Sequence, residues 1–346
     1  YARLSPHASP LNDFALAAYL YALRYYREYF AQCGQQSGLL QLLATADQEN
    51  AYASLLKQCN DNKLMRYCDQ NEASAIAGVE IAKSAVYYPQ AGWLQPRSLC
   101  SRLVDHPNIR VCLNTSVRGL QQKAGRWHFD HAGDQVVTET DSVIIAMGHH
   151  SNALPSTAFL PLKAIRGQVS YLHATTVSTK LRSVVCERSF ITPAHNGVHT
   201  VGASYNLAAT NMELSEQDHR HNMQQLGALL PGVTTSSPAA LQGRVGFRCV
   251  APDYLPVVGP VPHQAAFERD YAPLGKDAKA TVARVSEHAP GLYVNSAFGS
   301  RAYCFAPLCA ELLVSQISGE TAPLPAYISR ALLPGRFIVR NIIHGR

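Results

Sequence analysis

The chain has 346 residues, a formal charge of +6 and nine cysteines. This length exceeds the size at which a single core stops growing, so we expect two domains, consecutive or interleaved. No uninterrupted apolar run approaches the ~20 residues of a membrane helix, and the first residues do not resemble a signal peptide. The irregular cysteine spacing, without any C-x-x-C, disfavours a zinc site or a disulfide framework and fits a reducing cytoplasm.

The first predicted element is a helix over "SPLNDFALAAYLYALRYYREYF", with Ser9 as N-cap and Pro10 at the first helical position. It is apolar almost all round, which predicts a buried helix whose tyrosines belong to the core rather than stacking on bases. Residues 35–88 are more polar and predict further helices. The prolines and glycine of residues 89–96 mark a loop that enters another helix.

A β-rich block follows. "IRVCLNTSVRGLQQ" and "GRWHFDHAGDQVVTET" alternate apolar and polar residues around a "HAGD" turn, which predicts an antiparallel meander with one buried face. His128 and Asp130 alternate with apolar residues and so occupy the outer face of a strand, where we do not expect a metal site. "SVIIAMG" is instead a continuous apolar run closed by Gly148, as expected of a buried parallel strand whose C-terminal end faces a ligand.

After Pro161 the chain turns largely to strands, and then to a helix over "LSEQDHRHNMQQLGALLPG". His219 and His221 are two positions apart on that helix and point to different faces, so we do not expect them to share a metal. Strand-rich blocks thus alternate with α/β blocks, which predicts one domain inserted twice into another.

The stretch "GLYVNSAFGSRAYCFAPLCAELL" runs a short apolar strand into a turn of small residues and then into an apolar helix. Such a turn leaves backbone N–H groups unpaired at the helix start, and glycine lets a ligand approach the backbone closely. The stretch therefore predicts the edge of a site for a flat or anionic ligand. An ordinary strand-to-helix connection is the alternative.

The last seventeen residues carry four arginines and no acid. Such an excess of positive charge would attract a polyanion such as RNA with an affinity that depends on salt. A solvated basic tail is the alternative.

Several chemistries lack their motifs in this chain. It contains no G-x-x-x-x-G-K-[ST], no H-E-x-x-H and no G-x-S-x-G, so it shows no sign of a P-loop, a zinc protease or a nucleophile elbow. It also lacks G-x-G-x-x-G, the feature that a dinucleotide-binding domain most requires.

Six segments in chain order resemble the FAD-dependent D-amino acid oxidase, glycine oxidase and sarcosine oxidase superfamily. They are residues 92–99, 142–154, 161–172, 190–205, 243–262 and 291–313. Within the superfamily, "YARLSPHASPLNDF" and "LLPGRFIVRNIIHGR" at the two ends look like the C-terminal oxidoreductase part of the bifunctional tRNA 5-methylaminomethyl-2-thiouridine biosynthesis proteins, MnmC.

The resemblance implies a mixed α/β (α+β) fold, in which a Rossmann-like FAD-binding domain is interleaved with an antiparallel-sheet substrate domain. It assigns residues 1–34, 89–160 and 250–335 to the FAD-binding domain, 35–88 and 161–249 to the substrate domain, and 336–346 to a basic tail. The first βαβ unit of the superfamily, with its glycine-rich turn, is absent from this sequence. So is the S-adenosylmethionine-dependent methyltransferase domain of the bifunctional proteins. We therefore expect a fragment that by itself binds FAD poorly.

The resemblance also implies residues beside the cofactor. Gly148 and the loop of Gly299, Ser300, Arg301 and Ala302 would lie next to the flavin, where backbone N–H groups stabilise the negative charge of its reduced pyrimidine edge. Relatives usually have glycine where Ala302 stands. Arg166 and Gln168 would lie near the flavin where the chain enters the substrate domain.

For the substrate, the resemblance places Arg248 where related enzymes hold a carboxylate, for which a guanidinium is well suited; a structural ion pair is the alternative. Tyr205 would line the pocket or hydrogen-bond the substrate, with packing at the end of a strand as the alternative. Asp253 is expected to be a turn residue rather than a general base.

The implied substrate is 5-carboxymethylaminomethyl-(2-thio)uridine at the wobble position of tRNA. A hydride would pass from the glycine-type carbon to FAD, and hydrolysis of the imine would release aminomethyl-uridine and glyoxylate, without a metal. Two alternatives remain open: an oxidase of a free small amino acid or amine with the same cofactor, and a non-catalytic fragment or scaffold that docks tRNA.

Overall fold

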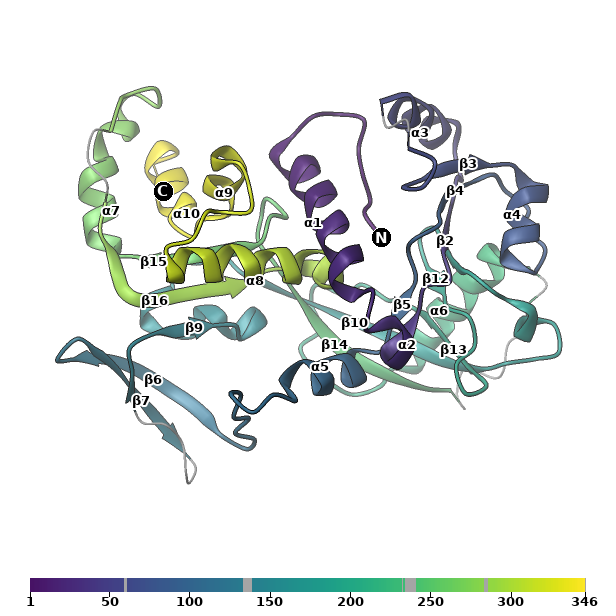
Figure 1. Ribbon diagram of the computed structural model, residues 1–346, viewed down its shortest axis with the longest axis horizontal. Coiled ribbons are helices and arrows are strands. Elements are labelled where there is room, and N and C mark those ends of the chain that lie inside the picture. The colour runs from purple at the N-terminus through teal and green to yellow at the C-terminus, as the bar shows by residue number, and fades with distance from the viewer. Residues whose placement is uncertain (59–60, 133–138, 232, 234–240, 283–285, 346) are drawn as a thin grey trace. The chain divides into compact units, whose positions relative to one another are not determined.

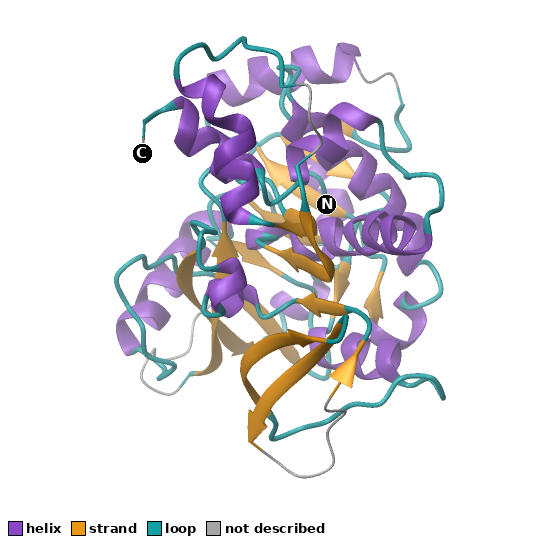
Figure 2. Ribbon diagram, turned by 90° about the vertical axis from the view of Figure 1, so that its left-hand side faces the viewer, coloured by secondary structure: helices purple, strands orange, loops and turns teal. Residues whose placement is uncertain are grey.

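The structure is a computed structural model that describes residues 1–58, 61–132, 139–231, 233, 241–282 and 286–345. The chain divides into two compact units, each formed by two separate segments. Unit 1 comprises Tyr1–His106 and Ile165–Phe247, and unit 2 comprises Pro107–Ala164 and Arg248–Arg346. Helices and strands occur in both (Figures 1 and 2).

An eight-stranded mixed sheet forms the centre of unit 1, in the order β14-β10-β13-β12-β11-β2-β4-β3. Its strands are β2 (Leu39–Leu42), β3 (Arg66–Cys68), β4 (Ala85–Tyr88), β10 (Lys163–His173), β11 (Val184–Cys186), β12 (Phe190–Ile191), β13 (Val198–Gly202) and β14 (Gln242–Val250). The pair of β2 and β11 is parallel, and its flanking pairs are antiparallel. Both strands of the parallel pair are buried along their length, as is typical of parallel strands with covered faces.

Helices α4 (Gln70–Ala77) and α6 (Glu216–Leu229) contribute to the core of unit 1. Ala73 of α4, Leu226 of α6 and Leu40 of β2 belong to one buried hydrophobic cluster. α6 begins where Ser215 caps it, its side chain accepting a hydrogen bond from the N–H of Asp218. The remaining elements of unit 1 are α2 (Phe30–Cys33), α3 (Ala46–Gln58), α5 (Pro96–Val104) and the short pair β1 (Gly34–Gln35) and β5 (Trp93–Leu94).

Helix α1 (Pro10–Tyr26) begins as predicted, with the Ser9 side chain accepting a hydrogen bond from the N–H of Asn12. Its inner face is buried, but Leu20 is 49% exposed, so the prediction of a buried helix holds for one face only. Tyr25 stacks between two further tyrosines, at ring-centroid distances of 6.4 and 5.7 Å, on the partly exposed side. Helical periodicity does not separate these tyrosines from the core ones, because both sets recur at helical spacing.

The central sheet of unit 2 has the order β15-β16-β9, formed by Val257–Pro262, His288–Ser296 and Val143–Ile145. β16 is antiparallel to β15 and parallel to β9. Helix α8 (Ala302–Ser318) lies along β15 and β16, as Figure 1 shows. Val143, Ile145 and Val294 share one buried cluster with Phe337 of the C-terminal helix α10 (Arg336–Ile343).

The predicted meander is confirmed over β6 (Ser116–Lys123), β7 (Arg126–Ala132) and β8 (Glu139–Thr140), which pair antiparallel. The predicted "HAGD" turn runs into residues outside the described ones. The prediction is wrong for the segment Ile109–Leu113, which has no strand partner among the described residues. Its alternate apolar side chains are 47%, 53% and 78% exposed.

The predicted basic tail is a helix in the structure. α10 follows α9 (Ala326–Leu332) and packs against α7 (Gln264–Tyr271), and it buries Phe337 and Ile338. Among the described residues, none of the helices has the length and apolarity needed to cross a bilayer. Over the same residues, His, Cys, Asp and Glu side chains do not gather in groups of three that could hold a metal.

Candidate active site

Two glycine turns lie beside each other at one edge of the unit 2 sheet. β9 and β16 run parallel with Ile145 opposite Val294, so their carboxyl ends meet at the same edge. The first turn leads into the short helix Gly148–Asn152 and the second into Gly299–Arg301 and then α8. In open α/β sheets, ligands bind outside the carboxyl ends of the strands, so this edge is the candidate site of unit 2.

Both turns use glycine for its backbone freedom. Gly148 and Gly299 each have a φ of +57°, in the left-handed region that other residues rarely adopt. A Cβ atom at Gly148 would meet no described atom within 4 Å, so the backbone there is open to a ligand. At Gly299 a Cβ would lie 3.2 Å from Cγ1 of Val250, so glycine also lets this turn pack against the end of β14.

Two buried serines join the turns. The Ser296 hydroxyl donates to the carbonyl oxygen of Gly148 at 3.0 Å, and the Ser151 hydroxyl donates to Ser296 Oγ at 3.2 Å. Cys249 Sγ lies 3.7 Å from Ser296 Oγ. Burial raises the pKa of this thiol, which keeps it neutral at physiological pH. The sequence interpretation did not single out these serines; the only available signal was a small polar residue next to each glycine turn.

The Gly299 turn offers backbone donors to a ligand. The N–H of Arg301 donates to the Phe298 carbonyl at 3.0 Å and closes the turn, so this amide is used within the protein. The dipole of the 17-residue helix α8 favours negative charge at its start. The backbone of Gly299 and Ser300, in the turn directly before this positive helix end, is therefore suited to an anionic group.

Arg248 lies near the end of β14, next to the same turn. Val250, two residues on, forms an antiparallel bridge with Phe298 and faces Gly299. Because side chains alternate along a strand, Arg248 shares the face of Val250, whereas Cys249 points into the core. Arg248 therefore lies on the strand face that carries Val250, and its predicted role as the ligand of the substrate carboxylate stays a prediction.

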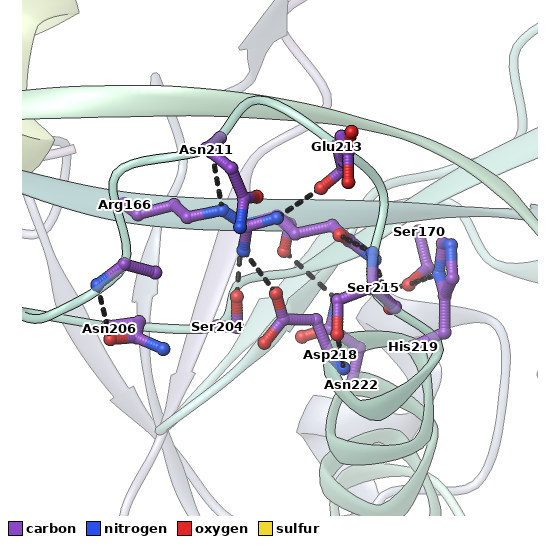
Figure 3. Close-up of polar contacts among 12 residues, drawn as sticks. Arg166, Ser170, Ser204, Asn206, Asn211, Glu213, Ser215, Asp218, His219 and Asn222 are labelled. Atoms are coloured by element: carbon purple, nitrogen blue, oxygen red, sulfur yellow. Dashed lines mark hydrogen bonds and ion pairs between the residues drawn. The ribbon is translucent and has the colours of Figure 1, made fainter.

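Arg166 and Gln168 are almost completely buried in unit 1. The Arg166 guanidinium pairs with Asp218 and donates to the carbonyl oxygens of Asn211, at 2.9 Å, and Glu213 (Figure 3). The Gln168 side chain donates to the Ser215 carbonyl oxygen and accepts from its N–H, both at 2.8 Å. These bonds tie residues 203–215 and the start of α6 to β10. The predicted contact of Arg166 and Gln168 with the cofactor stays a prediction.

Tyr205 follows β13 and is 56% exposed. Its two neighbours are fixed to β10, because the N–H of Ser204 donates to the Gln168 carbonyl at 3.1 Å and Asn206 bridges Arg166. The loop therefore presents Tyr205 from a rigid backbone, and its role in substrate binding stays a prediction.

Asp253 is a turn residue, as predicted. Its Oδ1 accepts a hydrogen bond from the N–H of Leu255 at 3.1 Å. Arg336 binds both of its carboxylate oxygens, at 2.8 and 3.1 Å. The carboxylate is thus used within the protein, as a charge partner rather than a base.

The unit 2 site fits the isoalloxazine ring of FAD in two observed respects. The backbone at Gly148 is open, and the Gly299 turn with the start of α8 supplies donors for the pyrimidine edge of the ring. Gly148, Gly299, Ser300 and Ala302 are the residues that would hold it.

Comparisons with known proteins agree with this fit. Residues 2–316 match the family model DAO, described as FAD dependent oxidoreductase. The chain is 36% identical to the tRNA 5-methylaminomethyl-2-thiouridine biosynthesis bifunctional protein MnmC of Chromobacterium violaceum, over 99% of this chain and 53% of that protein. It is 34% identical to the protein of the same name from Saccharophagus degradans, over 100% of this chain and 50% of that protein. The chain thus spans about half the length of these curated relatives.

Solved structures show the same fold. Glycine oxidase from Geobacillus kaustophilus matches with a TM-score of 0.71 at 16% identity, over 93% of this chain and 83% of that one. L-proline dehydrogenase from P. horikoshii matches with a TM-score of 0.73 at 14% identity, over 97% of this chain and 87% of that one. The predicted fold class is confirmed, and the chain belongs to the DAO family of FAD dependent oxidoreductases.

Proposed function

We propose that this chain removes the carboxymethyl group from 5-carboxymethylaminomethyl-(2-thio)uridine at the wobble position of tRNA. The observation that carries the proposal is the similarity over essentially the whole chain to proteins named for the biosynthesis of tRNA 5-methylaminomethyl-2-thiouridine. The products are aminomethyl-uridine and glyoxylate. In the bifunctional protein, S-adenosylmethionine would serve a separate methyltransferase domain.

Bound FAD would supply the acceptor for a hydride from the carbon between the substrate nitrogen and carboxylate. The Gly299 turn, at the positive end of the α8 dipole, would stabilise the negative charge that develops on the reduced ring. Ser296 and Ser151 hold this turn in register with Gly148, so the donors are fixed before the reaction begins.

Arg248 holds the substrate carboxylate in this proposal. A guanidinium binds a carboxylate through two parallel hydrogen bonds, which fixes both the distance and the orientation of the neighbouring carbon. Its position on the face of β14 that meets the Gly299 turn supports the assignment.

The test is oxidation of tRNA that carries the carboxymethylaminomethyl group, with FAD added and the nucleosides separated after digestion. We expect aminomethyl-uridine and an equal amount of glyoxylate. Arg248→Lys keeps the charge but loses the planar fork, so turnover should fall at least about tenfold without loss of the folded protein. Oxidation of free glycine or sarcosine in place of the modified tRNA would refute the proposal in favour of a metabolite oxidase.

A further inference from the structure

The helices α9 and α10 present a basic surface at the end of unit 2. From Thr321 to Gly345 the chain contains no Asp or Glu. Arg330 of α9 and Arg340 of α10 are exposed, and neither has an ion pair or side-chain hydrogen bond within the part of the chain that the structure describes. Tyr327, which is 54% exposed, precedes Arg330 by three residues and so lies on the same face of α9.

A third arginine fixes the two helices to each other. Arg336 Nη1 donates to the carbonyl oxygens of Leu332, at 2.8 Å, and Leu333, at 3.1 Å, at the end of α9. Its Nε and Nη2 bind the Asp253 carboxylate, and its side chain is 14% exposed. The charge of Arg336 is thus neutralised within unit 2, which leaves Arg330 and Arg340 as the cations available to a ligand.

The apolar faces of both helices are largely covered, with Ile343 at the end of α10 left 36% exposed. Ile328 and Leu332 of α9 and Phe337 and Ile338 of α10 are each at most 4% exposed. Insertion of an amphipathic helix into a membrane requires a free apolar face, so this arrangement favours a soluble polyanion over a lipid surface. The neighbouring segment 264–279, which includes α7 packed against α10, carries three acids and three bases and does not cancel the excess.

We propose that the helices α9 and α10, labelled in Figure 1, bind the phosphate backbone of RNA, with the exposed Arg330 and Arg340 as the contacts. The inference rests on the proposed function, which makes tRNA the polyanion that the protein meets. A guanidinium donates two parallel hydrogen bonds to a phosphate, and the ring of Tyr327 adds a surface on which a base or ribose can rest. The rigid clamp at Arg336 keeps the two contacts at a constant spacing.

The test is binding of a fluorescently labelled RNA hairpin to this chain, measured by anisotropy between about 50 and 200 mM salt. Arg330→Gln and Arg340→Gln should each reduce the slope of log affinity against log salt by about 0.7 to 0.9, and the affinity at 0.1 M salt by about five- to eightfold. Arg220→Gln is the matched control: this arginine is 61% exposed on α6 and should leave slope and affinity unchanged.

The inference would be overturned if both variants bound RNA with the slope and affinity of the Arg220 control. It would also be overturned if wild type and variants bound RNA equally at every salt concentration. Binding to phosphatidylserine vesicles but not to RNA would also overturn it, in favour of a lipid partner. The binding measurement needs no bound flavin. If the chain does not oxidise the modified tRNA but binds RNA through these arginines, the proposed function is rejected and the RNA-binding surface is retained.

Discussion

The Ser296 hydroxyl donates a hydrogen bond to the carbonyl oxygen of Gly148 at 3.0 Å, across 148 positions of sequence. This contact joins the turns that follow β9 and β16, the two parallel strands of unit 2. Ser151 donates to the same hydroxyl, so one buried oxygen serves as both acceptor and donor. The geometry of the candidate flavin site therefore depends on a short chain of neutral hydrogen bonds.

We expect Ser296→Ala to lower the free energy of unfolding by about 1–3 kcal/mol, because it removes the hydrogen bond to the Gly148 carbonyl and leaves the buried Ser151 hydroxyl without this acceptor. Urea denaturation measures the change. Ser318→Ala is the control, since this hydroxyl is exposed on the surface of α8, where it donates to the Val314 carbonyl. Its effect should stay within about 0.5 kcal/mol. A Ser296 variant as stable as this control would contradict the assigned role.

Gly299→Ala should destabilise the protein more than Gly148→Ala does. Both changes force alanine to a φ of +57°, which costs roughly 1–2 kcal/mol. Only at Gly299 does the new methyl group press on Val250, at 3.2 Å. Thermal or urea denaturation of the two variants gives the comparison. Gly319, at the C-terminal end of α8, also has a left-handed backbone, and a Cβ there would meet no described atom within 4 Å. Gly319→Ala therefore measures the free-energy cost of the backbone conformation alone. Equal losses at all three glycines would show that the Val250 contact relaxes.

Breaking the Arg166–Asp218 pair should cost about 3–5 kcal/mol, because removal of one partner leaves the other charge buried. Asp218→Asn is the mildest test, since it keeps the shape of the side chain. We also expect faster proteolysis within residues 203–215, which Arg166 holds through backbone carbonyls. Glu216→Gln, in an exposed pair with Arg220, should change stability by no more than about 0.5 kcal/mol.

Stability should fall on acidification below about pH 6.5. Burial lowers the pKa of His199, whose side chain lies between the Thr192 carbonyl at 2.8 Å and Ser178 Oγ at 2.9 Å. In this range the unfolded chain binds more protons than the folded one, so protonation favours unfolding. The loss begins at the unfolded pKa and stops growing below the folded one. Above that range the imidazole is neutral in both states and stability is insensitive to this group.

His199→Gln should flatten part of this pH dependence, as followed by urea midpoints between about pH 7.5 and 5.5. His149, His219 and His288, whose pKa values burial also lowers, contribute to the remainder. His7→Gln, at an exposed position, is the control and should reproduce the wild-type profile. A His199 variant with an unchanged profile would exclude this group as a source of the acid sensitivity.

Sequence patterns with a local cause were predicted well. Ser9 caps α1 because a hydroxyl can bond a nearby N–H, and the apolar run before Gly148 forms a parallel strand. Side-chain partners were not predictable, because they depend on which distant segments meet. The partners of Arg166 come from α6 and the loop that precedes it, which no local pattern indicates, and its expected contact with the cofactor stays a prediction. Arg336, expected in a solvated tail, instead binds a carboxylate 83 positions away.

The segment Ile109–Leu113 also shows that a local sequence pattern does not specify a distant partner. Its alternation is that of a strand, but alternation does not specify a neighbour, and among the described residues no strand lies against it.

An exposed apolar segment of this kind favours association between molecules, because burying its side chains against another chain removes apolar surface from water. We therefore expect concentrated solutions of this polypeptide to associate through this segment. A lysine in place of Val111, on the apolar face of the segment, should delay the rise in light scattering without changing the melting temperature.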